Sequence, residues 1–158
     1  MTPKSFRVQR SRTIAAPAAD IVRELEDFRR WVAWSPWEGS DPTMSREYDG
    51  PTSGVGARYR WSGNRKAGEG SMEIVAVDRP RSVDIRVVFS RPMRADNRVR
   101  FDLADTDGGT RVTWSMTGES SGLAGLFSRI VPMDRLVGGD FERGLDRLEA
   151  TVTAGRQA

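Results

Sequence analysis

Few side chains of this 158-residue chain could perform acid–base or nucleophilic chemistry, because the sequence contains neither cysteine nor histidine. Without a thiolate or an imidazole, the commonest nucleophile–base pairs and transition-metal sites are excluded. The candidates near a predicted apolar face are Tyr59, Asn64 and Glu69. These three form no catalytic set, and Tyr59 and Asn64 are better interpreted as polar anchors for a bound ligand. We therefore expect no catalytic residue, no metal site and no cofactor.

A larger set of residues is suited to binding a molecule. Several segments alternate between polar and large apolar residues, so each segment has one apolar face, as in a half-buried strand. Such a face can bind an apolar molecule by removing its surface from water, at roughly 25 cal/mol per Å². The residues predicted to contact the ligand are Trp34, Trp37, Tyr59, Trp61, Asn64, Met72, Ile74, Ile85, Val87, Phe89, Phe101, Trp114, Met116, Phe127 and Phe141.

The same residues have simpler interpretations. Large apolar side chains on one face of a sheet ordinarily fill a core, and the periodicity alone favours this interpretation. Trp34 and Trp37 suit a pocket rim, because indole joins an apolar body to one donor, but they equally suit a hydrophobic plug. The apolar segment 123–130 could cover a pocket, touch a membrane or a partner, or pack on the edge of the sheet.

These side chains must be positioned by one strand, two short helices, a run of strands and a long final helix. We predict strands at residues 6–14, 45–48, 57–62, 70–78, 82–90, 94–104 and 110–118, joined by short turns typical of an antiparallel meander. Short helices are expected after residue 15, at 28–34 and at 123–131. The final helix carries one apolar stripe, formed by Val137, Phe141, Leu145, Leu148 and Val152. The predicted class is α+β.

Three glycines interrupt the predicted final helix, namely Gly138, Gly139 and Gly144. Each costs about 1 kcal/mol relative to alanine in a helix interior. Close approach of the sheet or a ligand to the helix backbone would explain them. A local bend, or a helix that begins later, near Asp140, would explain them as well.

Composition restricts the partners and the location of the protein. The 25 basic residues exceed the 22 acidic ones by only three, and arginines alternate with carboxylates, so we expect no nucleic-acid binding. Charged residues of the other strand parity predict a solvated outer face. The sequence shows neither a secretory signal nor a bilayer-spanning stretch, which predicts a cytoplasmic protein without stable membrane insertion. We expect one domain over residues 1–158, with its core at about 6–154 and its oligomeric state open.

Several segments together carry a family resemblance, and their order and spacing matter more than any one of them. They are Trp34-Ser35-Pro36-Trp37, Gly54-Val55-Gly56 before Tyr59-Arg60-Trp61, the strand 109–118, and Gly139 to Leu145. The chain resembles the START-like superfamily, also called Bet v 1-like or SRPBCC, and within it the polyketide cyclase/dehydrase group. The resemblance covers about Phe6 to Ala150. It implies a helix-grip fold, in which a curved antiparallel sheet of about seven strands wraps around a long C-terminal helix and encloses a cavity.

The resemblance implies a small hydrophobic or amphipathic ligand, lipid- or polyketide-like, between the sheet and the helix. Two alternatives stay open. One is a polyketide cyclase, aromatase or dehydratase acting in the same cavity, which should hold a buried acid or a Tyr–carboxylate pair. The other is an interaction or stress-response module with a vestigial pocket.

Overall fold

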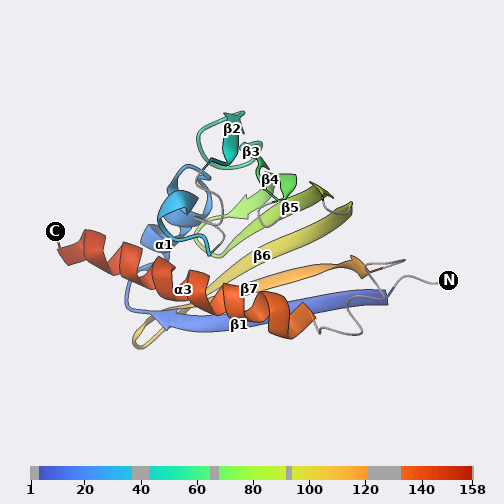
Figure 1. The fold of residues 1–158 in the computed structure, drawn as a ribbon. Coiled ribbons are helices and arrows are strands. Elements are labelled where there is room, and N and C mark those ends of the chain that lie inside the picture. The colour runs from blue at the N-terminus through green and yellow to red at the C-terminus, as the bar shows by residue number, and fades with distance from the viewer. Residues whose placement is uncertain (1–3, 37–42, 65–67, 92–93, 121–132, 158) are drawn as a thin grey trace.

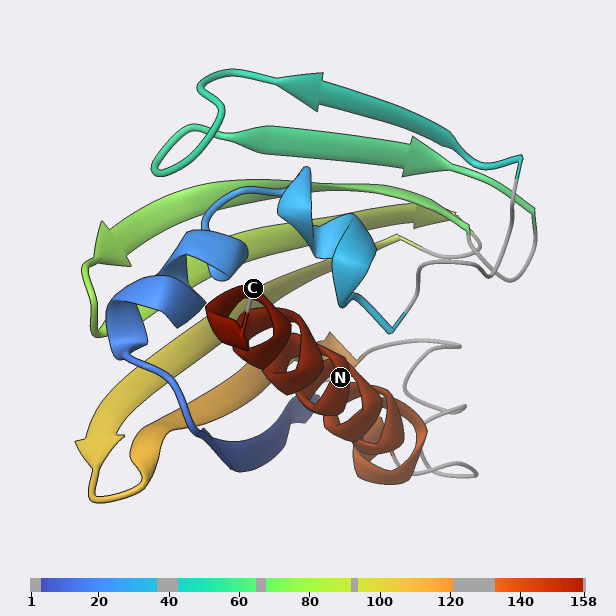
Figure 2. The same cartoon turned by 90° about the vertical axis from the view of Figure 1, so that its left-hand side faces the viewer.

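The protein folds as one curved antiparallel sheet of seven strands with its helices in the concave side (Figures 1 and 2). The structure is a computed structural model that describes residues 4–36, 43–64, 68–91, 94–120 and 133–157. The strand order is β1-β7-β6-β5-β4-β3-β2. The strands are β1 (Lys4–Ile14), β2 (Ser45–Asp49), β3 (Arg58–Ser62), β4 (Glu69–Asp78), β5 (Ser82–Arg91), β6 (Ala95–Thr106) and β7 (Gly109–Ser120).

Three helical elements accompany the sheet. They are α1 (Ala18–Leu25), the 3₁₀ helix η1 (Arg30–Ala33) and α3 (Met133–Gln157). This arrangement confirms the predicted α+β helix-grip fold, including two short helices after the first strand. The helix predicted at 28–34 is a single 3₁₀ turn, and Pro17 occupies the N-cap of α1 in an extended conformation. The helix predicted at 123–131 lies outside the described residues.

The register of the sheet brings alternate residues into rows across its concave side, which we call the inner face. Tyr59 pairs with Met72, Met72 with Val87, and Val87 with Asn97. The next row contains Ile74, Ile85, Val99 and Met116. Because successive side chains of a strand point to opposite faces, these rows put the predicted apolar residues on one side.

The helices cover the middle of the inner face with apolar side chains. Ile21, Val22 and Leu25 of α1 are buried. The described part of the predicted α3 stripe, Phe141, Leu145, Leu148 and Val152, is buried as well. The spacing in the sequence therefore correctly identified the side of α3 that contacts the sheet.

The beginning of α3 at Met133 excludes a later start near Asp140 as the reason for its glycines. A Cβ at Gly138 would collide with the Arg10 guanidinium. A Cβ at Gly144 would lie 2.6 Å from the Trp114 ring. Close approach of the helix to the sheet thus explains Gly144, whereas the neighbour of Gly138 is the end of a flexible arginine side chain.

Two arginines of β1 share the parity of the core residues Val8 and Ile14. Arg12 Nη2 lies 2.7 Å from Glu149 Oε1 of α3, and Arg10 Nε lies 3.6 Å from Glu142 Oε1. The hydrogen bond to Glu149 raises the pKa of the Arg12 guanidinium above its ordinary value. These ion pairs join β1 to the exposed side of α3, so this part of the strand does not line the core.

Candidate functional site

One half of the inner face is closed by an aromatic cluster, which consists of Trp31, Trp34, Phe101, Trp114 and Phe141. The rings of Trp114 and Phe141 stack with centroids 4.2 Å apart and an interplanar angle of 8°. Trp31 and Trp34 lie 4.5 Å apart, and Phe101 lies 4.9 Å from Trp114. All five side chains are at most 4% exposed. Four predicted ligand contacts, Trp34, Phe101, Trp114 and Phe141, therefore fill the core here, with Trp34 in the position of a plug.

The other half of the inner face is less completely covered. It lies at the end of the sheet where β3, β5 and β7 finish and where β4 and β6 begin. Phe6, Trp61 and Phe89 are only partly buried there and pack against the edge of the core. We call this region the open end, and it comprises Phe6, Trp61, Gly70, Met72, Val87, Phe89, Asn97, Met116 and Gly118.

Two glycines of the open end lie directly against aromatic rings. The rings of Trp61 and Phe89 meet edge to face, with centroids 5.6 Å apart and an interplanar angle of 82°. A Cβ on Gly70 would lie 2.6 Å from the Trp61 indole, so this glycine lets the ring lie close to β4. A Cβ on Gly118 would lie 2.8 Å from the Phe6 ring. The glycines thus let these aromatic rings lie close to the backbone of the sheet.

Asn97 is a polar residue among these apolar neighbours. Its side chain is buried on the inner face, and its Oδ1 accepts no hydrogen bond from the residues that the structure describes. Asn97 is not among the residues predicted from the sequence to contact the ligand. The alternation of β6 contains the signal, since Asn97 shares its parity with Val99, Phe101 and Leu103.

The remaining predicted contacts divide into three groups. Met72, Ile74, Ile85, Val87 and Met116 are buried on the inner face. Tyr59 is buried too and stacks on Trp61 with centroids 5.9 Å apart, whereas Asn64 is exposed in the turn after β3. Trp37 and Phe127 lie outside the described residues.

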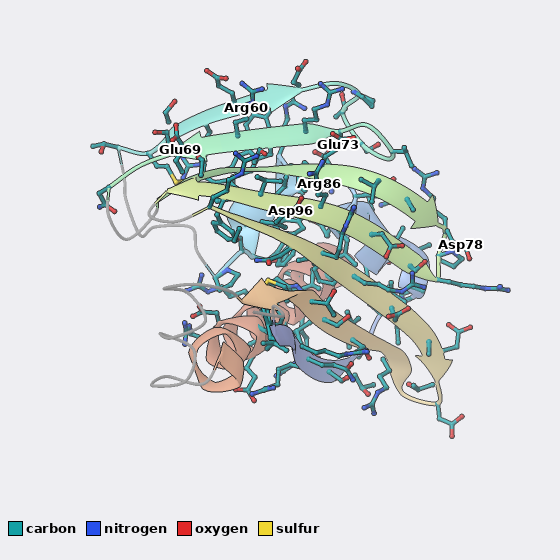
Figure 3. The ribbon with its side chains drawn as sticks, turned by 90° about the vertical axis from the view of Figure 1, so that its right-hand side faces the viewer. Arg60, Glu69, Glu73, Asp78, Arg86 and Asp96 are labelled. Carbon is teal, nitrogen blue, oxygen red and sulfur yellow. The ribbon has the colours of Figure 1, made fainter. Side chains whose placement is uncertain are left out.

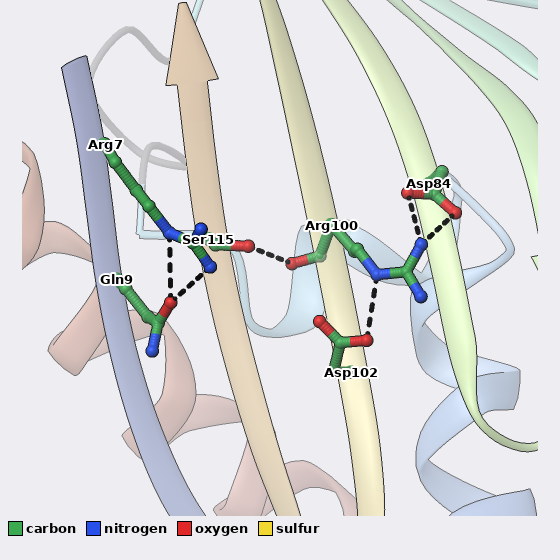
Figure 4. Close-up of polar contacts among 6 residues, drawn as sticks. All are labelled: Arg7, Gln9, Asp84, Arg100, Asp102 and Ser115. Carbon is green, nitrogen blue, oxygen red and sulfur yellow. Dashed lines mark hydrogen bonds and ion pairs between the residues drawn. The ribbon is translucent and has the colours of Figure 1, made fainter.

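The outer face carries the charged residues that the other strand parity predicted (Figure 3). Arg100 lies 3.0 Å from Asp84 and 2.8 Å from Asp102, which joins β5 to β6 (Figure 4). Arg86 lies 2.6 Å from Asp96 on the same two strands. Glu69, a candidate acid in the sequence, accepts a hydrogen bond from Ser90. These charges pair with one another on an exposed surface.

The Arg86–Asp96 pair predicts a small pH dependence of stability. The hydrogen bond from Arg86 holds the pKa of Asp96 below its ordinary value of 3.8. The stabilisation is therefore complete above that value and is lost as the pH falls through the lower folded pKa. In thermal melts at about pH 5, Asp96→Asn should unfold at a lower temperature than wild type, and this difference in melting temperature should shrink towards about pH 2.5. Asp107→Asn in the β6–β7 turn is the control. A difference in melting temperature that is the same at both pH values would contradict the prediction.

A hollow of about 380 Å³ lies on the β2–β3 hairpin, away from the open end. It is lined by Glu47, Tyr48, Asp49, Arg58, Tyr59 and Arg60, so its lining is largely charged and does not match an apolar ligand. Within the described ranges, acidic side chains form no cluster that could hold a metal ion. In the same ranges, helices long and apolar enough to cross a bilayer are absent.

Comparison with known proteins assigns the fold to a family. The family model described as polyketide cyclase / dehydrase and lipid transport matches residues 5–153. The chain belongs to this family. Membership in the polyketide cyclase/dehydrase and lipid-transport family confirms the resemblance seen in the sequence. No curated protein matches the chain.

Solved structures of the same fold extend this assignment. Protein SA2116 from Staphylococcus aureus is 13% identical with a TM-score of 0.71, and the alignment covers 99% of this chain and 98% of that one. Norcoclaurine synthase from Thalictrum flavum is 13% identical with a TM-score of 0.69 and 99% coverage of both chains. DynU16, encoded in the dynemicin biosynthetic locus, is 15% identical with a TM-score of 0.65, covering 94% of this chain and 48% of that one. At these identities the likeness shows the fold that this family member shares with them.

Proposed function

We propose that the protein binds a small hydrophobic or amphipathic molecule, lipid- or polyketide-like, at the open end of the inner face. The observation that carries the proposal is the partial exposure of Phe6, Trp61 and Phe89 on the concave side of the sheet. Large aromatic side chains on a concave surface gain free energy when a ligand removes them from water. The aromatic cluster fills the other half of the inner face, so one end of the ligand would contact this cluster.

The family supports a ligand of this kind. Its description names polyketides as well as lipid transport, both of which involve largely apolar molecules. The norcoclaurine synthase of the same fold is described in complex with a transition-state analogue. A small molecule held by this fold is therefore consistent with the proposal.

The polar groups of the inner face favour binding over catalysis. From the row of Ile74 and Met116 to the open end, the described side chains of β3–β7 offer three polar groups, which are the Tyr59 hydroxyl, the Trp61 indole N–H and the Asn97 amide. General acid–base catalysis needs a group with a suitable pKa within reach of the reacting atom. A primary amide does not titrate, so Asn97 can orient a ligand but cannot exchange a proton with it.

A charge placed on the open end should weaken binding of an apolar probe. We expect Phe89→Glu to raise the dissociation constant of N-phenyl-1-naphthylamine by about tenfold or more, because the probe would lose an aromatic contact and desolvate a carboxylate. The measurement is a fluorescence titration of the probe. Val75→Glu is the matched control, because Val75 is 36% exposed on the same sheet and is not one of the residues of the open end. Equal affinities in wild type and Phe89→Glu would refute the proposed site.

The class of the natural ligand requires a different experiment. Native mass spectrometry of protein purified from its own host, with the released molecules identified, should yield a stoichiometric lipid or polyketide. Empty protein would instead favour a polyketide cyclase or dehydratase that releases its product, or an interaction module. The cytoplasmic location stays a prediction from the sequence.

A further inference from the structure

The buried side-chain oxygen of Asn97 forms no hydrogen bond with the described part of the protein. Its side chain is 5% exposed, and Oδ1 receives no donor from the described part of the chain. A buried polar group without a partner destabilises a protein, because the hydrogen bonds it made to water in the unfolded chain are not replaced. Residues that break a packing rule without a local benefit are concentrated at functional sites.

The neighbours of Asn97 explain why its Oδ1 lacks a donor among the described residues. On β5 the opposite residue is Val87, which has no polar side-chain atom. On β7 the register that pairs Arg98 with Thr117 places Gly118 opposite Asn97. A Cβ on Gly118 would collide with Oδ1, so the amide occupies space that any other residue at 118 would fill. The open end therefore holds a buried polar group with apolar neighbours, beside the ring of the partly exposed Phe6.

The position of Asn97 distinguishes it from another buried group. Trp34 Nε1 also lacks an acceptor among the described residues. Trp34, however, lies inside the closed aromatic cluster, 0% exposed and in contact with the rings of Trp31 and Trp114. Asn97 instead lies in the row of Met72 and Val87, beside the partly exposed Phe6. Only the second location borders the partly exposed aromatic residues of the open end.

We propose that Asn97 is the specificity-determining residue of this site and that it selects a neutral ligand with a hydroxyl group near one end. This inference rests on the proposed function. A primary amide presents one acceptor oxygen and two donor hydrogens, and a hydroxyl can donate to the first or accept from the second. The hydroxyl hydrogen-bonds to the amide, while the hydrocarbon part of the ligand covers Phe6, Trp61 and Phe89.

The distribution of charge disfavours a carboxylate at the same position. Arg46 is on the inner face too, but it is on β2, four strands from β6, which is about 19 Å along the sheet. Arg10 and Arg12 pair with Glu142 and Glu149 of α3. A carboxylate beside Asn97 would be buried without a cation from the described residues, which is unfavourable.

The test compares three naphthalenes that differ in one substituent: 2-naphthol, 2-methylnaphthalene and 2-naphthoate. Each displaces N-phenyl-1-naphthylamine from the protein in a fluorescence competition at neutral pH. We expect wild type to bind 2-naphthol about tenfold more tightly than 2-methylnaphthalene, and 2-naphthoate most weakly. In Asn97→Leu, whose side chain branches at the same atom but is apolar, the preference for 2-naphthol over 2-methylnaphthalene should disappear.

The thermal stability of Asn97→Leu provides a second readout. Because leucine removes a buried oxygen that has no donor among the described residues, the melting temperature of the variant should equal or exceed that of wild type. A clear decrease would show that the amide has a structural partner and would overturn the inference. Equal binding of 2-naphthol and 2-methylnaphthalene by wild type would overturn it as well, while leaving the proposed function intact. If wild type bound neither of them nor the reporter probe, the proposed function itself would fail.

Discussion

Replacing Gly144 with valine should lower the free energy of unfolding by about 3 kcal/mol. The new Cβ would lie 2.6 Å from the Trp114 ring and 3.0 Å from Cδ of Pro36. Trp114 cannot easily move away, because its other contacts include the stacked ring of Phe141 and the ring of Phe101. The helix must therefore shift away from the sheet. Urea denaturation followed by circular dichroism measures the loss.

Gly139→Ala is the matched control in the same helix. Among the described residues, and apart from the backbone of its own helix, a Cβ on Gly139 would have one neighbour within 4 Å, the end of the Arg143 side chain at 3.7 Å. Alanine there should stabilise the protein by about 0.5–1 kcal/mol, since it restricts the unfolded chain and fits the helix. If both glycine substitutions had the same effect, α3 would not approach Trp114 as closely as described.

Phe141→Ala should cost about 3–5 kcal/mol of stability. Phe141 is completely buried and stacks on Trp114 at 4.2 Å, so truncation removes apolar contact area and leaves a cavity under α3. Denaturant unfolding gives the magnitude, and the near-ultraviolet circular dichroism of the tryptophans should weaken as well. Val55→Ala, at a side chain that is 58% exposed, should change stability by less than about 0.5 kcal/mol. A loss below about 1 kcal/mol for Phe141→Ala would mean that the aromatic cluster is not closed by α3.

Much of the fold could be predicted from periodicity. Alternation placed Met72, Ile74 and Phe101 on one face, and the spacing of Phe141, Leu145 and Leu148 placed these residues on one side of the last helix. Both patterns depend only on the geometry of a single strand or helix. Antiparallel pairing followed from the short turns between strands.

The boundary between core and site could not be predicted in this way. Trp114 and Phe89 have the same apolar, inward character in the sequence, but only Trp114 is covered by α3 and η1. Coverage depends on where the helices dock, which involves contacts between distant segments such as Gly144 with Trp114. Asn97 was missed because one asparagine in an alternating strand has little meaning until its neighbours Val87 and Gly118 are known.

Methyl NMR of protein labelled at the methionine methyl groups would show where a ligand lies. Met72 and Met116 belong to the open end, where they lie in neighbouring rows of the inner face. An aromatic ligand shifts the resonances of methyl groups beneath its ring. Addition of saturating N-phenyl-1-naphthylamine should therefore shift the Met72 and Met116 signals. If the probe were bound and neither signal shifted, the result would contradict a ligand site on the inner face of the sheet.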